Sequence, residues 1–178
     1  MSGLRTISQK ASAAGLPLLL IGGYAVMAHG FVRATDDLDL LVQSSRRDQW
    51  RRLMEDMGLS LYREAPTFMQ FNPSAGAGLP VDLMLVADDV FERMRADARQ
   101  ALGQEVPLGV VSLLHLIALK CHAIQHGKAL RRVKDTEDLI QLITRNGLNL
   151  NEPELQATVL KHGNQELYDK LQHACAPE

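Results

Sequence analysis

The chain has 178 residues, a formal net charge of −2 at pH 7, 46% hydrophobic residues and 22% charged residues. This composition is ordinary for a soluble globular protein, and the length suits one domain or a domain with a small helical appendage. A net charge this small excludes a global attraction to nucleic acids or membranes, so any contact with a polyanion must be local.

One short apolar run and two cysteines narrow the class of protein further. The apolar run at 16–21 is too short to span a bilayer and is followed by two glycines, so it is interpreted as a buried strand and not as a signal or anchor. Cys121 and Cys175 form neither a CxxC metal motif nor a disulfide framework. We therefore expect a cytoplasmic protein with no membrane partner.

Helices and strands are expected to alternate over the first half of the chain. Glycines favour helix ends at Gly15, Gly30 and Gly58, and the helix at 48–57 has apolar residues three and four positions apart. In chain order, the expected elements are a helix (4–15), a strand (18–21), a helix (24–29), a strand (38–42), a helix (48–57), two strands (59–63 and 67–71), a loop (72–78), a strand (81–86) and a helix from 88 to about 102.

The second half of the chain is expected to be helical after a short extended piece near 106–110. Ser112 can cap the first of these helices. The expected helices are 113 to about 125, 133–144, 154–161 and 165–174. The sequence thus predicts an α/β (α+β) core at 1–105, followed by a helical region at 106–178.

Two aspartates at the start of one predicted strand carry the strongest chemical signal. Alternate strand residues point the same way, so Asp37 and Asp39 project together while Leu38 and Leu40 face the opposite side. Adjacent carboxylates repel each other, and a hard divalent cation such as Mg²⁺ would relieve that repulsion. The pair is therefore interpreted as a metal site.

A third aspartate, Asp82, lies between Val81 and Leu83 in another predicted strand. An acid among apolar residues is costly unless it is paired, exposed or bound to a cation. If this strand adjoins the strand of Asp39, three acids converge as two-metal phosphoryl transfer requires, and Asp82 could act as a general base. The alternative is that Asp82 caps the preceding loop or faces solvent on an edge strand.

The residues just before these acids suggest contacts with phosphate. Gly22 and Gly23, between a strand and a helix, can bring backbone N–H groups onto a phosphate, although most such pairs are only tight turns. Arg33 would bind phosphate and Thr35 would orient the carboxylates. Their alternative interpretation is a surface arginine and a turn threonine.

Together these motifs resemble the nucleotidyltransferase superfamily, whose members include polymerase β and the antibiotic nucleotidyltransferases. The resemblance is closest to the AbiEii-type bacterial branch, many of whose members are toxins of toxin–antitoxin pairs. It covers roughly residues 16–145 and implies a small mixed-sheet nucleotidyltransferase core with a helical C-terminal part. The residues that carry it are Gly22-Gly23, Arg33, Thr35, Asp37-Leu38-Asp39 and Val81-Asp82-Leu83.

The same branch has a helix with a Leu-Lys motif and a later Lys-Asp near an arginine. Here these would be Leu119-Lys120 and Lys134-Asp135, with Asp138 following. Two alternatives stay open. Lys120 can extend its ammonium out of its apolar surroundings into solvent, and the acidic stretch from Lys134 can be a solvated helix start.

The resemblance implies that ATP or another nucleoside triphosphate binds with Mg²⁺, and that its NMP moiety is transferred to an acceptor with release of pyrophosphate. Asp37 and Asp39 would hold the metal and Asp82 would complete the site. The implied nucleotide-binding residues are Gly22, Gly23, Arg33, Thr35, Lys120, Lys134 and Asp135.

Three functional interpretations follow. The first is an active transferase acting on a hydroxyl of RNA, protein or a small molecule, with a cognate antitoxin if the chain is a toxin. The second is a catalytically silent nucleotidyltransferase-like module that binds a nucleotide or a partner. The third, a regulatory partner of a toxin, lacks a DNA-binding helix-turn-helix signal and ranks last.

Overall fold

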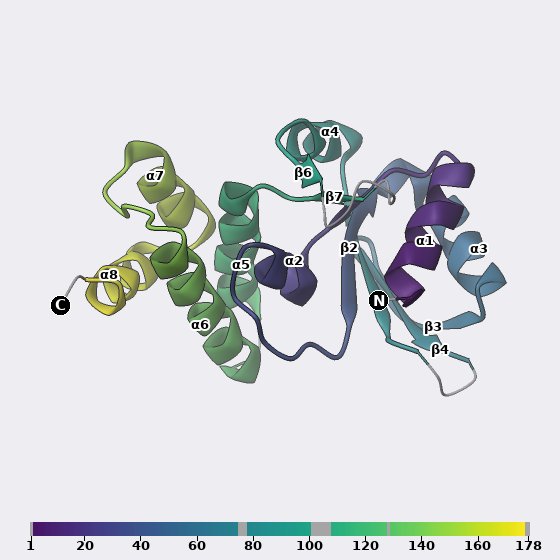
Figure 1. Ribbon diagram of the computed structural model, residues 1–178, viewed down its shortest axis with the longest axis horizontal. Helices are drawn as coiled ribbons and strands as arrows, with labels where there is room; N and C mark the ends of the chain where they lie inside the picture. Colours follow the sequence, from purple (N-terminus) through teal and green to yellow (C-terminus); the bar gives the residue numbers. More distant parts are fainter. Residues whose placement is uncertain (1, 75–77, 101–107, 128, 177–178) are drawn as a thin grey trace. The chain divides into compact units, whose positions relative to one another are not determined.

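The computed structural model describes residues 2–74, 78–100, 108–127 and 129–176 (Figure 1). The chain forms two compact units. The sheet unit runs to Ala28 and resumes from Arg33 to Val111, whereas the helical unit comprises His29–Val32 and the chain from Ser112 onward. The boundary predicted near residue 105 lies outside the described residues.

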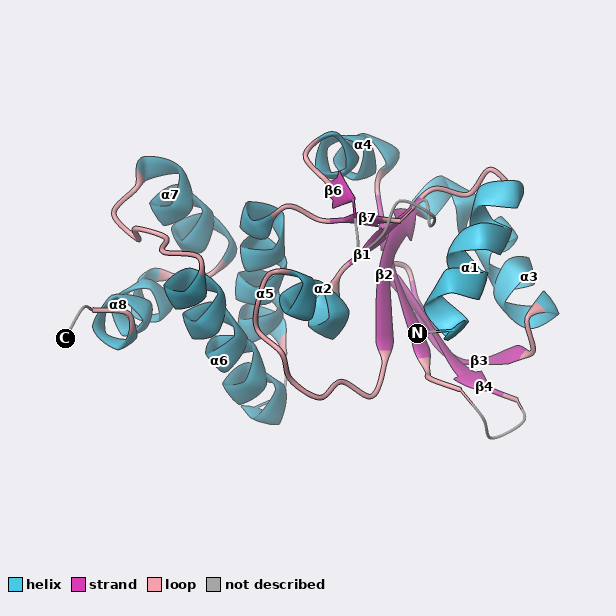
Figure 2. Cartoon of the chain, in the orientation of Figure 1, coloured by secondary structure: helices cyan, strands magenta, loops and turns pink. Residues whose placement is uncertain are grey.

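The described part of the sheet unit contains one seven-stranded mixed sheet, drawn in magenta in Figure 2, with strand order β3-β4-β5-β2-β1-β7-β6. The pairs β2/β5 and β1/β7 are parallel, and the other neighbours are antiparallel. All five strands expected in the first half of the chain are present. The bounds are β1 Leu18–Leu20, β2 Leu38–Gln43, β3 Leu59–Ala65, β4 Phe68–Pro73, β5 Val81–Val86, β6 Arg99–Gln100 and β7 Gly109–Val110.

Alternation along the strands places the core on one face and polar groups on the other. In β5, Val81, Leu83 and Leu85 are buried, while Asp82 and Met84 between them are only half-buried. The helices cover the apolar surface that remains. They are α1 Ser2–Ala13, α2 Gly22–Ala28, the short 3-10 helix η1 Ser44–Arg46, α3 Arg47–Asp56 and α4 Asp88–Ala96.

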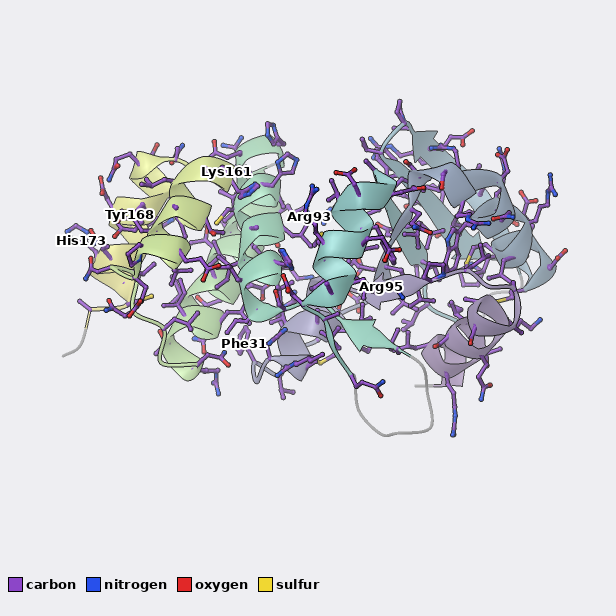
Figure 3. The ribbon with its side chains drawn as sticks, turned by 90° about the horizontal axis from the view of Figure 1, so that it is seen from above. Phe31, Arg93, Arg95, Lys161, Tyr168 and His173 are labelled. Atoms are coloured by element: carbon purple, nitrogen blue, oxygen red, sulfur yellow. The ribbon has the colours of Figure 1, made fainter. Side chains whose placement is uncertain are left out.

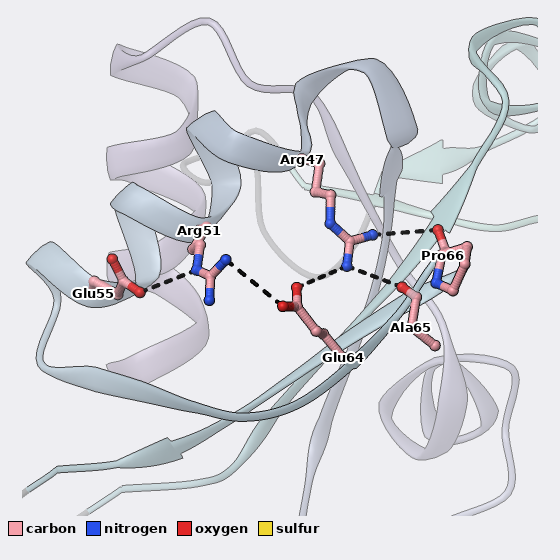
Figure 4. Close-up of polar contacts among 6 residues, drawn as sticks. All are labelled: Arg47, Arg51, Glu55, Glu64, Ala65 and Pro66. Carbon is pink, nitrogen blue, oxygen red and sulfur yellow. Dashed lines mark hydrogen bonds and ion pairs between the residues drawn. The ribbon is translucent and has the colours of Figure 1, made fainter.

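Helix α3 is fixed to the sheet by apolar and polar contacts. Trp50 and Met54 are fully buried. At the start of the helix the Arg47 guanidinium donates to the Glu64 carboxylate at 2.9 Å and to the Ala65 carbonyl at 3.0 Å, as Figure 4 shows. The hydrogen bond from Arg47 is the main reason that the pKa of Glu64 is lowered. Arg47 therefore joins the start of α3 to the end of β3.

The helix predicted from residue 88 to about 102 is shorter than expected. Helix α4 ends at Ala96, and Arg99–Gln100 pairs with β7 as strand β6. Beyond Phe91 and Met94, the buried face of α4 offers little further apolar surface, so pairing with β7 satisfies the backbone better than another turn of helix. Residues 101 and 102 lie outside the described residues.

The helical unit contains α5 Leu113–His126, α6 Ala129–Arg145, α7 Pro153–His162 and α8 Gln165–Ala174. The Ser112 side chain accepts a hydrogen bond from the His115 N–H, and that of Asn164 accepts one from Leu167, so both caps follow the usual chemistry. Tyr168, labelled in Figure 3, is buried, and its hydroxyl donates to the Leu150 carbonyl at 3.1 Å.

Helix α6 starts earlier than the expected residue 133. The Arg132 side chain, in its first turns, donates to the carbonyl oxygens of Gly127 and Gln125 at the end of α5. These bonds satisfy carbonyls that a helix end leaves without intrahelical partners. Arg132 in the first turn of α6 thus caps the C-terminal end of α5.

The loop His29–Val32 belongs to the helical unit, although in the chain it lies between α2 and β2 of the sheet unit. His29 is buried, and the Asn146 side chain donates to the His29 carbonyl at 3.0 Å. The Arg145 guanidinium lies over the Phe31 ring at 5.5 Å. The chain therefore enters the helical unit and returns before β2 begins. Across the described ranges, every helix is too short or too polar to cross a membrane.

Candidate active site

The sheet places two aspartates side by side. Strands β2 and β5 are parallel neighbours, and Asp39 is the register partner of Asp82. Both side chains are half-buried, whereas the strand neighbours of Asp39, Leu38 and Leu40, are buried on the opposite face. The two carboxylates therefore occupy the same face of the sheet, as period-two alternation requires.

Asp37 joins this pair from the residues just before β2. One carboxylate oxygen from each of Asp37, Asp39 and Asp82 can be chosen so that all three atoms lie within 4.8 Å of one another. We call these residues the acid triad. Three like charges this close repel one another, and a divalent cation bound between them would relieve the repulsion.

Gly22 explains how the chain passes so close to the acid triad. A Cβ added at Gly22 would lie 1.8 Å from Asp39 Oδ2, and the residue has φ of +61°, where a side chain is strained. A Cβ at Gly23 would lie 2.4 Å from Thr35 Oγ1. The structure thus requires glycine at both positions for close approach, and the triphosphate-lining role of the pair stays a prediction.

Thr35 and Arg33 lie on the loop that leads to the triad. The Thr35 hydroxyl donates to Asp37 Oδ1 at 3.0 Å, so it holds this carboxylate. The Arg33 guanidinium donates to the Ala34 carbonyl at 2.8 Å and is half-buried. Phosphate binding by Arg33 stays a prediction.

One residue of the site was missed from sequence. Gln70, on β4, is the register partner of Asp82, and its side-chain amide donates to Asp82 Oδ2 at 2.6 Å. The available signal was weak, since Gln70 is a single polar residue between the buried Met69 and Phe71. Only the pairing of β4 with β5 reveals its partner.

The other predicted nucleotide-binding residues belong to the helical unit. The Lys120 ammonium lies 2.6 Å from Asp135 Oδ1 and 2.6 Å from Asp138 Oδ2, and all three side chains are buried. We call these three residues the buried ion cluster. Lys134 is exposed beside it. The cluster joins α5 to α6, and the nucleotide-binding roles of Lys120, Lys134 and Asp135 stay predictions.

The donor set of the acid triad suits a hard divalent cation. Its carboxylate oxygens are the ligands that Mg²⁺ prefers, and half-exposed carboxylates leave room for the water and phosphate oxygens that complete its coordination. A Zn²⁺ site would normally include histidine or cysteine. The residues present therefore fit the Mg²⁺ expected from sequence.

Known structures resemble this one closely. The solution structure of the antibiotic-resistance factor ANT(2'')-Ia superposes with a TM-score of 0.66 at 19% identity, covering 96% of this chain and 93% of that chain. An antigenic nucleotidyltransferase-like protein from Paracoccidioides brasiliensis gives 0.60 at 16% identity, covering 98% and 90%. The lincosamide adenylyltransferase LnuA gives 0.56 at 15%, covering 78% and 95%. The fold is that of a nucleotidyltransferase.

The nucleotidyltransferase fold confirms the fold class expected from the sequence, a mixed-sheet core together with helices. By sequence, no family model and no curated protein matches the chain. The narrower resemblance to AbiEii-type proteins stays a prediction.

Proposed function

We propose that this chain is a Mg²⁺-dependent nucleotidyltransferase that transfers an NMP moiety from a nucleoside triphosphate to an acceptor hydroxyl. The observation that carries the proposal is the acid triad, whose carboxylate oxygens come from two segments of a nucleotidyltransferase-like sheet unit, 37–39 and strand β5, and lie within 4.8 Å of one another. Like charges gathered in one place are more often found at functional sites than elsewhere in a fold.

In the proposed reaction, the acceptor oxygen forms a bond to the α-phosphorus, and the bond from that phosphorus to the bridging oxygen breaks. Pyrophosphate leaves, and Asp82 accepts the proton of the acceptor hydroxyl as general base. Asp37 and Asp39 would hold Mg²⁺, with Asp82 completing the set. The bound ion would supply charge neutralisation for the triphosphate.

The residues around the triad support this chemistry in separate ways. Gly22 leaves the space that Asp39 occupies, and the Thr35 hydroxyl orients Asp37. Gly23 and Arg33 would contact the triphosphate. In the helical unit, Lys120, Lys134 and Asp135 would assist nucleotide or acceptor binding, as the resemblance implies.

For the acceptor, structural neighbours favour a small molecule as the first class to test. One structure of ANT(2'')-Ia contains adenylyl-2''-tobramycin (TM-score 0.68, 18% identity), and one of LnuA contains lincomycin. A hydroxyl of RNA or protein is the second class. A role as a toxin with a cognate antitoxin belongs with that second class.

The decisive test incubates the protein with α-labelled nucleoside triphosphates, Mg²⁺ and pools of aminoglycosides, lincosamides, RNA and protein. We expect labelled product with the parent chain and loss of at least about 100-fold in rate for Asp37→Asn, since a charged ligand of the Mg²⁺ that would neutralise the transition state is lost. Asp36→Asn is the matched control, because Asp36 is an exposed acid next to the triad but outside it.

Two results would contradict the proposal. Full transfer by the Asp37→Asn variant would remove the triad from the reaction. Nucleotide binding by the parent chain without transfer to any pool would favour the catalytically silent module instead.

A further inference from the structure

Gln70 is tied to the acid triad by the register of the sheet. Strand β4 runs antiparallel to β5, with Gln70 directly opposite Asp82. The flanking residues Met69 and Phe71 are fully buried, so their packing fixes which face of β4 the Gln70 side chain occupies. Gln70 and Asp82 therefore share a face of the sheet as a cross-strand pair.

The contact between the two side chains is short and specific. Gln70 Nε2 lies 2.6 Å from Asp82 Oδ2, and the pair is partly buried. A hydrogen bond from an amide to an ionised carboxylate is shorter and roughly twice as strong as one between neutral groups. The bond restricts rotation of the Asp82 carboxylate and so selects how it faces Asp37 and Asp39.

The chemistry of the donor matters as much as its position. An amide is neutral, so it orients Asp82 and leaves the negative charge of the triad in place. A lysine or arginine in the same position would cancel part of that charge and compete with a bound cation. Thr35 acts on Asp37 in the same manner, through a neutral hydroxyl at 3.0 Å.

We propose that Gln70 is a positioning residue that holds the Asp82 carboxylate in the orientation needed for cation binding and for proton acceptance. This inference rests on the proposed nucleotidyl transfer for its second half only. Its first half concerns the affinity of the triad for a divalent cation. Groups that orient metal ligands in this way typically change metal affinity or activity by about 10- to 100-fold when removed.

The test compares Gln70→Met with Gln43→Met. Methionine keeps the length of glutamine and removes the donor. Gln43 is the matched control because its amide also donates to a carboxylate, that of Glu92 at 3.2 Å, at an exposed place outside the acid triad. Mn²⁺ affinity is measured by electron paramagnetic resonance, and kcat and KM for the triphosphate are measured separately.

We expect Gln70→Met to bind Mn²⁺ about 10- to 100-fold more weakly and to lose kcat by a similar factor, with a smaller change in KM. Gln43→Met should match the parent in Mn²⁺ affinity, kcat and KM. A parental Mn²⁺ affinity and kcat in Gln70→Met would overturn the inference. A merely structural role would lower the melting temperature and leave Mn²⁺ affinity unchanged in the folded variant, which would also overturn it.

One further outcome separates this inference from the proposed function. If the parent binds Mn²⁺ but transfers nothing, a weaker Mn²⁺ affinity in Gln70→Met supports the positioning role while the transferase proposal fails.

If Gln70→Met does not fold, Gln70→Glu replaces it as the test variant. Its carboxylate cannot donate at pH 8 and repels Asp82, so it should lose kcat at least as strongly, and a parental kcat would overturn the inference.

Discussion

The acid triad of the sheet unit and the buried ion cluster of the helical unit both gather aspartates, but they differ in burial and in the side chains that donate to them. The triad is half-buried, and Thr35 and Gln70, which donate to it, are neutral. In the cluster, Asp135 and Asp138 are buried and share the ammonium of Lys120 at 2.6 Å. A lysine ammonium joins the two acids of the cluster, and a hydroxyl and an amide donate to two acids of the triad.

This difference separates a structural use of carboxylates from a chemical one. Buried acids must be paired, so the cluster must carry its own cation to fold. The triad is only half-buried, so its carboxylates keep contact with solvent, from which a metal ion can bind them.

Removing the cation of the cluster should give the largest effect. Lys120→Met leaves two buried carboxylates without their ammonium, so we expect unfolding free energy to fall by about 3–5 kcal/mol. Urea denaturation measures it. Lys134→Met, an exposed neighbour, should change stability by less than about 0.5 kcal/mol. A stable Lys120→Met variant with poor triphosphate binding would instead support the nucleotide-binding role of Lys120.

Supplying a cation to the triad should give the next largest effect. Mg²⁺ at about 100 times its dissociation constant should stabilise the parent by about 2.7 kcal/mol, because only the folded chain gathers the three acids. Asp39→Asn should lose this gain, because it removes one of the three carboxylates. Thermal unfolding in Mg²⁺ and in EDTA measures the gain in each variant. An equal Mg²⁺ gain in Asp39→Asn would contradict the site.

Crowding the triad should give a smaller loss that is specific to its position. Gly22→Ala and Gly15→Ala both place a side chain at positive φ, which costs roughly 1–2 kcal/mol in each. A Cβ at Gly15 meets nothing within 4 Å, whereas one at Gly22 overlaps Asp39. We therefore expect only Gly22→Ala to lose Mg²⁺-dependent stabilisation as well. Equal Mg²⁺ responses in the two variants would show that Gly22 has no special relation to Asp39.

Local patterns predicted much of this site, and long-range pairing supplied the rest. The i,i+2 spacing of Asp37 and Asp39 and the polar Asp82 in an apolar strand are visible in the sequence. The neighbouring position of β2 and β5 depends on topology, because these strands are not consecutive in the chain. The contact of Gln70 with Asp82 is not predicted from the sequence for the same reason, because the register between β4 and β5 determines it.

The helical unit shows a similar limit. The sequence places the Lys120 ammonium in apolar surroundings and shows a group of acids from Asp135 to Asp138. Their mutual pairing depends on how α5 packs against α6, which no local pattern encodes. The end of α4 was misplaced because pairing of Arg99–Gln100 with β7 overrides helix propensity.

The excursion of His29–Val32 into the helical unit has a consequence for how the protein can be divided. The chain leaves the sheet unit at the end of α2 and returns at Arg33, shortly before the aspartates, with His29 and Phe31 contacted by Asn146 and Arg145. A truncation after Val111 would remove the residues against which His29 and Phe31 pack. One cut in the chain therefore does not separate the two units, and a chimera that replaces the helical unit must also replace His29–Val32.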